Sequence, residues 1–373
     1  MGDDDAVAQL LDLARDIFGT PVAALARAAV PGQGPVVEQA SSALDPRATV
    51  RLLADTDLTR GALAVDVLRP DGTPGGRLLG VPAGAVEPLD SRQVEALHVV
   101  AALVAGVLHH RDRRRAEHRG RLASLEALVR GRGRSTVLQP IVDVRTGAVV
   151  GAEALSRFTG EDGYPRGPEQ VFADARSAGA GVQLERAAVA SALALLPGLP
   201  AGTYLSVNAS AEALMDPATR EVLLASQPER VVVEVTEHDP VIDYAALAES
   251  TAELRAGGLR LAVDDAGSGF ASLQHVLHLS PDVVKLDIAF VRGIDADPAR
   301  RAVARALVGF ATEVGSTMVA EGVERTAELS VLRELGVHCA QGYLLGRPAL
   351  PPLPVVRPDD TTTVLLPAQP REH

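Results

Sequence analysis

Two short stretches of the sequence decide the fold: RLAVDD at residues 260–265 and DVVKLD at residues 282–287. Each is an apolar run with the length of a buried strand, and each ends on charged residues. Six similar runs occur, at Thr136–Val142, Ala148–Ala152, Tyr204–Val207, Arg230–Val235, Thr317–Ala320 and Val337–Ala340. Helical spacing of apolar residues lies between most of the runs, as in Leu184–Leu196, Ala246–Ala256 and Arg300–Val314. This alternation predicts a parallel α/β barrel; a doubly wound open sheet is the alternative, disfavoured by the absence of a Gly-x-Gly-x-x-Gly turn.

Polar side chains that can bind a metal ion, a phosphate or a proton stand at the ends of seven successive predicted strands. They are Glu153, Asn208, Glu234, Asp264 with Asp265, Lys285, Glu321 and Gln341. Barrel enzymes collect their active sites at the carboxyl ends of the strands. Clustered carboxylates repel one another unless cations lie between them. Five carboxylates and one amide oxygen suit Mg²⁺ or Mn²⁺ better than zinc, so the sequence predicts a site for such ions here.

Two of these residues are unusual in the composition of the chain. Lys285 is the only lysine and Asn208 is the only asparagine, although the chain holds 36 basic residues. A sequence that avoids a residue type elsewhere is expected to keep it where the chemistry requires it. Chance survival is the alternative, and it is weakened because both residues fall at predicted strand ends.

The order of short motifs along residues 134–350 resembles the EAL domain family. The matching segments are LQPIVD at 138–143, GAEALSRF at 151–158, SVNAS at 206–210, EVTE at 234–237, DDAGSG at 264–269, VKLD at 284–287, AEGVE at 320–324 and QGY at 341–343. The resemblance implies a TIM-type (β/α)8 barrel whose first strand runs antiparallel to the others. It also implies a phosphodiesterase that hydrolyses cyclic di-GMP to linear pGpG with two Mg²⁺ or Mn²⁺ ions.

The resemblance also implies a role for individual residues. The ligands of one ion would be Glu153, Asn208, Glu234 and Asp264, and those of the second would be Asp264, Asp265 and Glu321. The candidate catalytic residues are Lys285, which would orient or deprotonate the attacking water, Glu153, Asp265, and Glu237, which would anchor the Asp265–Gly269 loop. The candidate substrate-binding residues are Gln139, Arg157, Asp287, Glu324 and Gln341. Asp287 as a strand-end cap and Glu324 as a solvated acid at a helix start are the plainer interpretations.

Three positions depart from the pattern that is common in the family. Ala266 stands where phenylalanine is usual, Leu138 where an aromatic residue is common, and Phe158 where tryptophan is usual. These departures bear on rate and on control by the loop. Two other functions remain open: a receptor that binds cyclic di-GMP without cleaving it, and a metal-assisted aldolase that uses Lys285 as a Schiff base. No Gly-Gly-Asp-Glu-Phe motif of a diguanylate cyclase occurs.

The first 115 residues predict a different, smaller α+β domain that resembles a GAF-type sensor in layout. We expect a helix at Ala6–Phe18 and strands at Val22–Ala26, Thr49–Leu53, Gly61–Leu68 and Arg77–Gly80. The predicted organisation is a regulatory domain at 1–115, a signalling helix within 91–133, the EAL domain at 134–350 and a flexible proline-rich tail at 351–373. We expect a homodimer whose first domain receives a small-molecule or protein signal.

Composition excludes several classes of partner and location. A formal net charge of −12 argues against binding of DNA or RNA polymers, which requires a basic surface. The single cysteine, Cys339, excludes internal disulfides and suits a reducing compartment. The first residues lack the basic start of a signal peptide, and the apolar run Leu97–Leu108 is too short to span a bilayer. The sequence therefore predicts a cytoplasmic protein without membrane insertion.

Overall fold

The computed structural model describes residues 3–27, 36–42, 63–70, 73–81, 90–235, 244–266 and 270–353. The chain divides into two compact units, Met1–Arg121 and Leu122–His373. We describe the two units separately.

The second unit is an eight-stranded closed barrel. Its strands are β5 (Arg134–Asp143), β6 (Val149–Thr159), β8 (Tyr204–Ala209), β9 (Val231–Val235), β10 (Arg260–Ala266), β11 (Val283–Leu286), β12 (Thr317–Ala320) and β13 (Cys339–Ala340). The barrel closes because β5 pairs with both β13 and β6, antiparallel in each case. Every other neighbouring pair of barrel strands is parallel. The expected TIM-type barrel with an antiparallel first strand is therefore confirmed.

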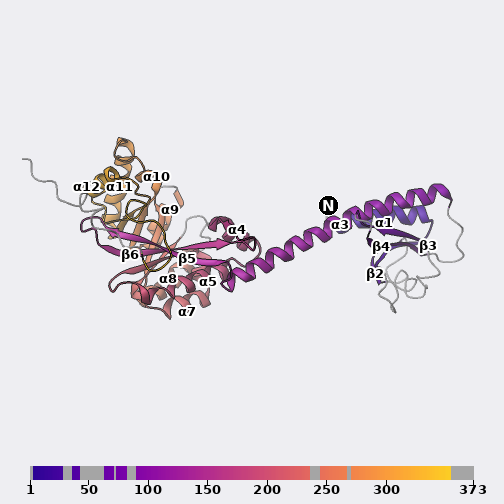
Figure 1. Ribbon diagram of the computed structural model, residues 1–373, viewed down its shortest axis with the longest axis horizontal. Helices are drawn as coiled ribbons and strands as arrows, with labels where there is room; N and C mark the ends of the chain where they lie inside the picture. The colour runs from indigo at the N-terminus through magenta and orange to yellow at the C-terminus, as the bar shows by residue number, and fades with distance from the viewer. Residues whose placement is uncertain are drawn as a thin grey trace, which may run out of the picture. The chain divides into compact units, whose positions relative to one another are not determined.

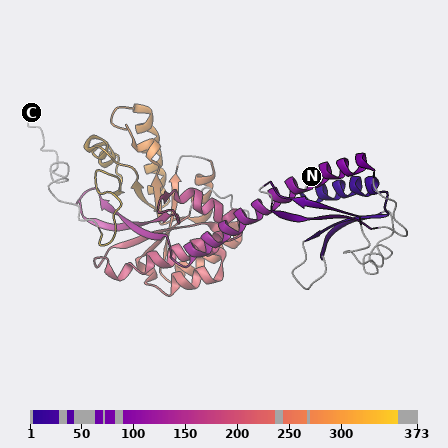
Figure 2. The same cartoon turned by 45° about the vertical axis from the view of Figure 1, so that its right-hand side comes forward.

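Helices cover the outside of the barrel strands (Figures 1 and 2). They are α4 (Pro168–Ser177), α5 (Gly181–Leu193), α6 (Ala211–Met215), α7 (Pro217–Leu224), α8 (Tyr244–Ala256), α9 (Phe270–Leu279), α10 (Ile288–Val291), α11 (Pro298–Glu313) and α12 (Thr326–Glu334). Local sequence fixes several of their starts. Asp297 accepts hydrogen bonds from the N–H groups of Ala299 and Arg300 and precedes Pro298, which is the usual chemistry of a helix N-terminus.

One sequence expectation about β6 is wrong. The apolar run predicted a strand that ends before Glu153, whereas β6 continues to Thr159 and carries Glu153 in its middle. The reason is its pairing with β5, which runs from Arg134 opposite Phe158 to Val142 opposite Val149. The parallel partner β8 contacts only the Gly151–Ala154 part of β6. The rest of the hairpin therefore extends past the rim of the barrel, with the two-residue strand β7 (Pro165–Arg166) at its end.

The first unit packs helices against a four-stranded antiparallel sheet of order β2-β1-β4-β3. Its elements are α1 (Asp3–Phe18), β1 (Val22–Arg27), β2 (Val36–Ser42), β3 (Leu63–Leu68), β4 (Pro74–Val81) and the first part of α3 (Ser91–Val129). Side chains of α1, of the sheet and of α3 form one buried apolar cluster. The sequence analysis missed β2, and its predicted strand Thr49–Leu53 lies outside the described residues. The resemblance to a GAF domain stays a prediction, as does the flexible tail, of which residues 354–373 are not described.

Among the described helices, α3 has the length and composition that would allow a helix to cross a membrane. Its most apolar stretch contributes Leu97, Val100, Val104 and Leu108 to the core of the first unit. A core helix passes the same test of length and composition, so this finding is weak evidence for a membrane span.

Candidate active site

The candidate site lies inside the barrel, directly above an apolar floor. In five neighbouring segments an apolar residue is followed two positions later by a polar one, and side chains two apart along a strand point to the same side. The pairs are Val232 and Glu234, Ala262 and Asp264, Val283 and Lys285, Val319 and Glu321, and Cys339 and Gln341. The apolar members form one buried cluster with Ile141. The polar members therefore gather at the carboxyl ends of the parallel strands, where TIM-barrel sites form.

The ammonium group of Lys285 stands at the centre of this polar layer. Its Nζ atom lies 2.5 Å from Glu321 Oε1, 2.6 Å from Glu234 Oε2, 3.3 Å from Asp264 Oδ1 and 3.6 Å from Glu153 Oε1. The side chains of Lys285 and Glu234 are 2% and 1% exposed. Buried charges persist only when opposite charges and hydrogen bonds compensate them, so each of these groups depends on the others.

Three neutral side chains orient the two most buried acids. Ser206 Oγ donates to Glu234 Oε1 at 2.5 Å. Asn208 Nδ2 donates to Glu153 Oε1 at 3.1 Å, and Gln341 Nε2 donates to Glu153 Oε2 at 2.6 Å. Both oxygens of Glu153 are thus held, one from β8 and the other from the residue that follows β13. The other amide atom of Gln341, Oε1, is buried without a hydrogen-bond partner among the described residues, which leaves an unsatisfied acceptor in this layer.

Burial and the neighbouring charges move the pKa values of these acids in different directions. Burial and the neighbouring Glu153 raise the pKa of Glu234 well above its usual value, and burial raises the pKa of Glu321 to about 8. Burial also disfavours ionised Glu153, but Lys285 and the amide donors outweigh it and lower the pKa of this carboxyl. Burial opposes the Lys285 ammonium, yet the four carboxylates raise its pKa well above the usual value. A charged, enclosed lysine is poorly suited to Schiff-base formation, which disfavours the aldolase alternative.

The donor set suits hard divalent cations. Among the described residues no three His, Cys, Asp or Glu side chains are arranged as a ready metal site, because the carboxylates converge on Lys285 instead. Four carboxyl groups surround a single ammonium, so one lysine cannot neutralise them all when they are ionised, and the raised pKa values of Glu234 and Glu321 reflect this excess. The available ligands are oxygens, which Mg²⁺ and Mn²⁺ prefer. The residues present therefore fit such ions in chemistry and in charge.

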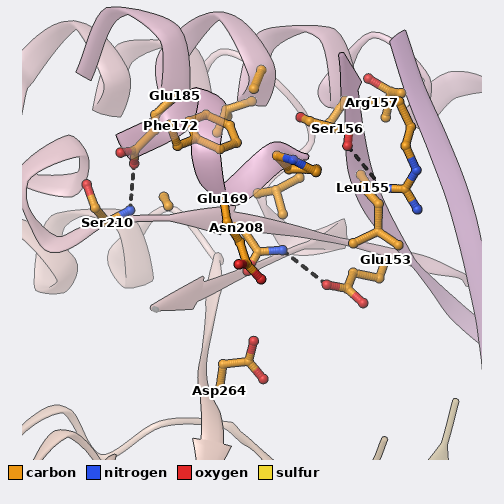
Figure 3. Close-up of a pocket in the computed structure, with 18 of the residues that line it drawn as sticks. Glu153, Leu155, Ser156, Arg157, Glu169, Phe172, Glu185, Asn208, Ser210 and Asp264 are labelled. Atoms are coloured by element: carbon orange, nitrogen blue, oxygen red, sulfur yellow. Dashed lines mark hydrogen bonds between the residues drawn. The ribbon is translucent and has the colours of Figure 1, made fainter. Parts of the chain in front are cut away.

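A cavity of about 550 Å³ opens beside the acids (Figure 3). Glu153, Asn208 and Asp264 line one side of it. The remaining walls come from β5, β6, α4, α5 and the end of β8, and they include Thr136, Leu155, Arg157, Glu169, Phe172, Arg176, Glu185, Val189 and Ala192. Its volume lies in the usual range of ligand pockets, about 300–1,000 Å³. Apolar walls beside an acidic layer provide a place for a flat apolar group and a charged group side by side.

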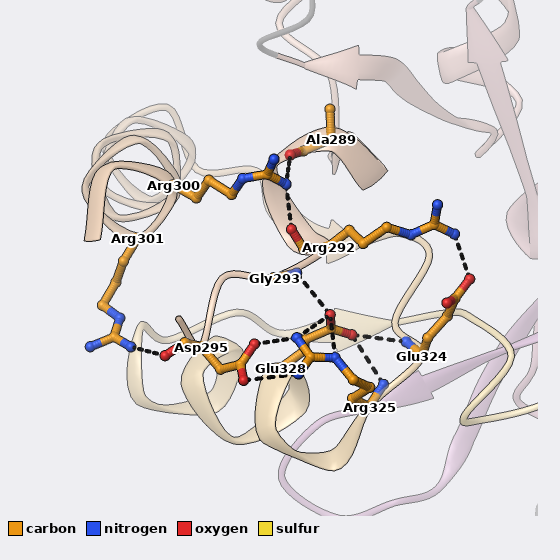
Figure 4. Close-up of polar contacts among 9 residues, drawn as sticks. All are labelled: Ala289, Arg292, Gly293, Asp295, Arg300, Arg301, Glu324, Arg325 and Glu328. Carbon is orange, nitrogen blue, oxygen red and sulfur yellow. Dashed lines mark hydrogen bonds and ion pairs between the residues drawn. The ribbon is translucent and has the colours of Figure 1, made fainter. Parts of the chain in front are cut away.

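Three predicted substrate-side residues have partners outside this cavity. Gln139 is buried, and its Nε2 donates to the Gly346 carbonyl at 3.1 Å. Asp287 caps α10 by accepting a hydrogen bond from the Ala289 N–H. Glu324 pairs with Arg292 at 2.5 Å (Figure 4). Their contact with a substrate stays a prediction. Arg157, in contrast, lines the cavity, with one bond from Nη1 to the Ser156 carbonyl at 3.0 Å.

The segment that follows Glu321 is fixed by the buried acid Glu328. This carboxylate accepts hydrogen bonds from the backbone N–H groups of Gly293, Glu324 and Arg325 and from the Arg325 guanidinium (Figure 4). Burial alone would raise the pKa of Glu328, but these donors lower it. Arg325 also pairs with Asp295, which ties the loop after β12 to the loop after α10. The backbone on the carboxyl side of Glu321 is therefore held in one arrangement.

Part of the predicted site cannot be placed. Asp265 belongs to β10, but its side chain lies outside the described part of the structure, as do Glu237 and Gly267–Gly269. Their roles stay predictions.

The sequence analysis missed three residues that the structure brings to the site. Ser206 has a readable signal, because it lies two positions before Asn208 and thus on the same face of β8. Phe172 and Glu185 lie on α4 and α5, and Glu185 Oε2 accepts a hydrogen bond from the Ser210 N–H at 2.8 Å. Their approach to the strand ends depends on how these helices pack, which residue spacing alone does not indicate.

Comparison with known proteins identifies the family. The family model of the EAL domain matches residues 122–348, more than half of the chain, so the chain belongs to the EAL domain family. The resemblance seen in the sequence is thereby confirmed.

The chain is also similar to named relatives and to a solved structure. A Pseudomonas aeruginosa protein named cyclic di-GMP phosphodiesterase PA2567 is 30% identical over 224 residues, which is 58% of this chain and 38% of that protein. An Escherichia coli protein named probable cyclic di-GMP phosphodiesterase PdeG is 28% identical over 220 residues, or 56% and 43%. The solved structure of the PaMucR phosphodiesterase in complex with c-di-GMP is 29% identical, with a TM-score of 0.55, covering 62% of this chain and 98% of that chain. The chain spans less than half the length of the two curated relatives.

Replacement of Lys285 by methionine should strongly destabilise the metal-free protein. The substitution leaves four carboxyl groups, of which Glu153 and Glu234 are buried, without their cation, and removing one partner of a buried ion pair costs about 3–5 kcal/mol. Thermal and urea unfolding in EDTA measure this loss. The matched control is Arg130→Met, which removes an exposed pair with Glu126 and should cost less than about 1 kcal/mol. Equal stability of Lys285→Met and wild type would contradict the central place of this ammonium.

Proposed function

We propose that this chain is a metal-dependent phosphodiesterase that hydrolyses cyclic di-GMP to linear pGpG. The observation that carries the proposal is the convergence of Glu153, Glu234, Asp264 and Glu321 on one buried lysine, beside a ligand-sized cavity that Glu153 and Asp264 line. The names of the relatives support the choice of substrate.

The proposed ligands follow from the oxygen donors of this layer. Glu153, Asn208, Glu234 and Asp264 would hold one ion, and Asp264, Asp265 and Glu321 would hold the other. When bound, Mg²⁺ or Mn²⁺ ions stabilise negative charge on a phosphate and lower the pKa of water. Lys285, Ser206 and Gln341 hydrogen-bond or ion-pair with these acids, and these contacts would hold the carboxylates in place. Lys285 stays the residue proposed to act on the attacking water; its raised pKa favours orienting the water over deprotonating it.

The cavity supplies binding groups for the substrate. Arg157 would donate to a phosphate oxygen, for which a guanidinium is geometrically suited. Phe172 and Val189 offer apolar area for a base. Water attack on phosphorus then breaks one P–O3′ bond, and the 5′-phosphate remains on the linear product. Gln139, Asp287, Glu324 and Gln341 stay proposed contacts of the substrate.

Loss of a single proposed metal ligand should abolish turnover without unfolding the protein. Glu153→Gln keeps the size of the side chain but removes the charge, and we expect at least a 100-fold lower rate, since preorganised charge at a site contributes factors of about 10² to 10³. Hydrolysis of cyclic di-GMP with Mg²⁺ or Mn²⁺, followed by chromatography, measures the rate.

Glu313→Gln at the end of α11 is the matched control and should retain full activity. Undiminished turnover in folded Glu153→Gln would refute the assignment. Tight binding of cyclic di-GMP by a wild type that forms no product would favour the receptor function instead.

We further propose that the Met1–Arg121 unit regulates the enzyme in a cytoplasmic homodimer, in response to an unidentified small-molecule or protein signal. The continuity of α3 from this unit into residues that belong to the second unit supports this role. Deletion of residues 1–115 should therefore change both turnover and oligomeric state. Measurement of the rate and of the mass by light scattering tests this expectation. A deletion variant with the turnover and the oligomeric state of the full chain would contradict it.

A further inference from the structure

The start of β5 lies on the same side of the barrel as the catalytic acids. Because β5 runs antiparallel to its neighbours, its first residues lie at the carboxyl ends of the parallel strands. Arg134 is opposite Phe158, four residues beyond Ala154, where the pairing of β6 with β8 ends. Thr136, two positions after Arg134 on the same face, lines the cavity. Arg134, the first residue of β5, is therefore two positions from a residue that lines the cavity.

Arg134 joins the last turn of α3 to α5. Its Nε donates to the Leu128 carbonyl at 3.1 Å, and its Nη1 donates to the Ala187 carbonyl at 2.6 Å and to Ser191 Oγ at 2.8 Å. Leu128 is one residue from the end of α3, so a cation at its carbonyl is well placed against the helix dipole. Each partner is neutral, and no carboxylate of the described residues is ion-paired with Arg134.

Helix α5 is a wall of the cavity. Glu185, Ala188, Val189 and Ala192 line it, and the two α5 residues that hold Arg134 lie next to Ala188 and Ala192 in sequence. Arg134 is thus bonded to the helix that forms this wall, within one helical turn of the lining residues.

An apolar route runs beside the polar one. Leu125 and Leu128 of α3 share a buried cluster with Phe158 of β6 and Leu184 of α5. Phe158 meets Phe172 edge to face, with ring centroids 5.3 Å apart, and Phe172 lines the cavity. A polar and an apolar set of contacts therefore connect the end of α3 to the same pocket.

We propose that Arg134 is a positioning residue: it fixes the α5 wall of the substrate pocket to the last turn of α3, so that movement of this turn changes the affinity for substrate. This inference rests on the proposed function, because the affinity concerned is that for cyclic di-GMP. Reciprocity follows from linkage: substrate binding must also change the stability of residues 122–134.

The first test compares Arg134→Leu with Arg230→Leu in the full chain. Arg230 is a matched control because it also donates to neutral carbonyls, those of Thr203 and Pro200, but immediately before β9 at the opposite end of the barrel. We expect Arg134→Leu to raise KM for cyclic di-GMP about 5- to 20-fold, in the range of measured coupling between sites, with a much smaller change in kcat. Arg230→Leu should lower Tm without moving KM.

Arg134→Lys tests the geometry, because an ammonium keeps the charge but lacks the planar fork. Arg134→Lys should have an affinity for cyclic di-GMP between those of wild type and Arg134→Leu. If Arg134→Leu does not fold, Arg134→Lys is compared with Arg230→Leu in its place. Folded Arg134 variants with the KM of Arg230→Leu would overturn the proposal.

Hydrogen exchange of the full chain measures the reciprocal effect. In the Glu321→Gln background, where turnover is prevented, cyclic di-GMP should slow exchange both in pocket residues 153–158 and in residues 122–134. Adding Arg134→Leu should remove only the second effect. Protection of the pocket alone in the parent would overturn the proposal and leave the proposed function standing. Absence of both hydrolysis by wild type and protection of the pocket would overturn the two together.

Discussion

The compensation of buried charge around Lys285 is the constraint on which the rest of this structure depends. Four carboxylates from β6, β9, β10 and the end of β12 meet one ammonium from β11, and none of these groups is tolerable in the barrel alone. The apolar floor excludes water from one side, which strengthens every charge interaction above it. A layer with an excess of carboxyl groups under these conditions suits divalent cations. Its repulsion lowers the stability of the fold, as is common at functional sites.

The direction of β5 has a second consequence. In an all-parallel barrel the segment before the first strand would arrive at the end remote from the site. Here the reversal brings the end of α3 and Arg134 to the side of the acid layer, in contact with α5, which forms a wall of the cavity. The end of α3 is therefore connected to the cavity through Arg134 and through the Phe158–Phe172 contact.

Much of the barrel and of its acid layer could be predicted, because both depend on local patterns. Apolar runs mark the strands, and the spacing of two between Val232 and Glu234 or between Val283 and Lys285 orients the polar residues. The length of β6 could not be predicted, because pairing with β5 extends the strand beyond its apolar run. Phe172, Glu185 and Arg134 also escaped detection, since their positions depend on how α3, α4 and α5 pack. The strand β2 was missed because Val36–Ser42 ends in small and polar residues without an alternating pattern.

The most direct test is analysis of the products formed from cyclic di-GMP by the purified full chain, with Mg²⁺ or Mn²⁺ and with EDTA. The account predicts pGpG as the product, formed only when a divalent ion is present. Formation of pGpG at an undiminished rate in EDTA would contradict the role given to the acid layer. Absence of any product with either ion would contradict the proposed reaction.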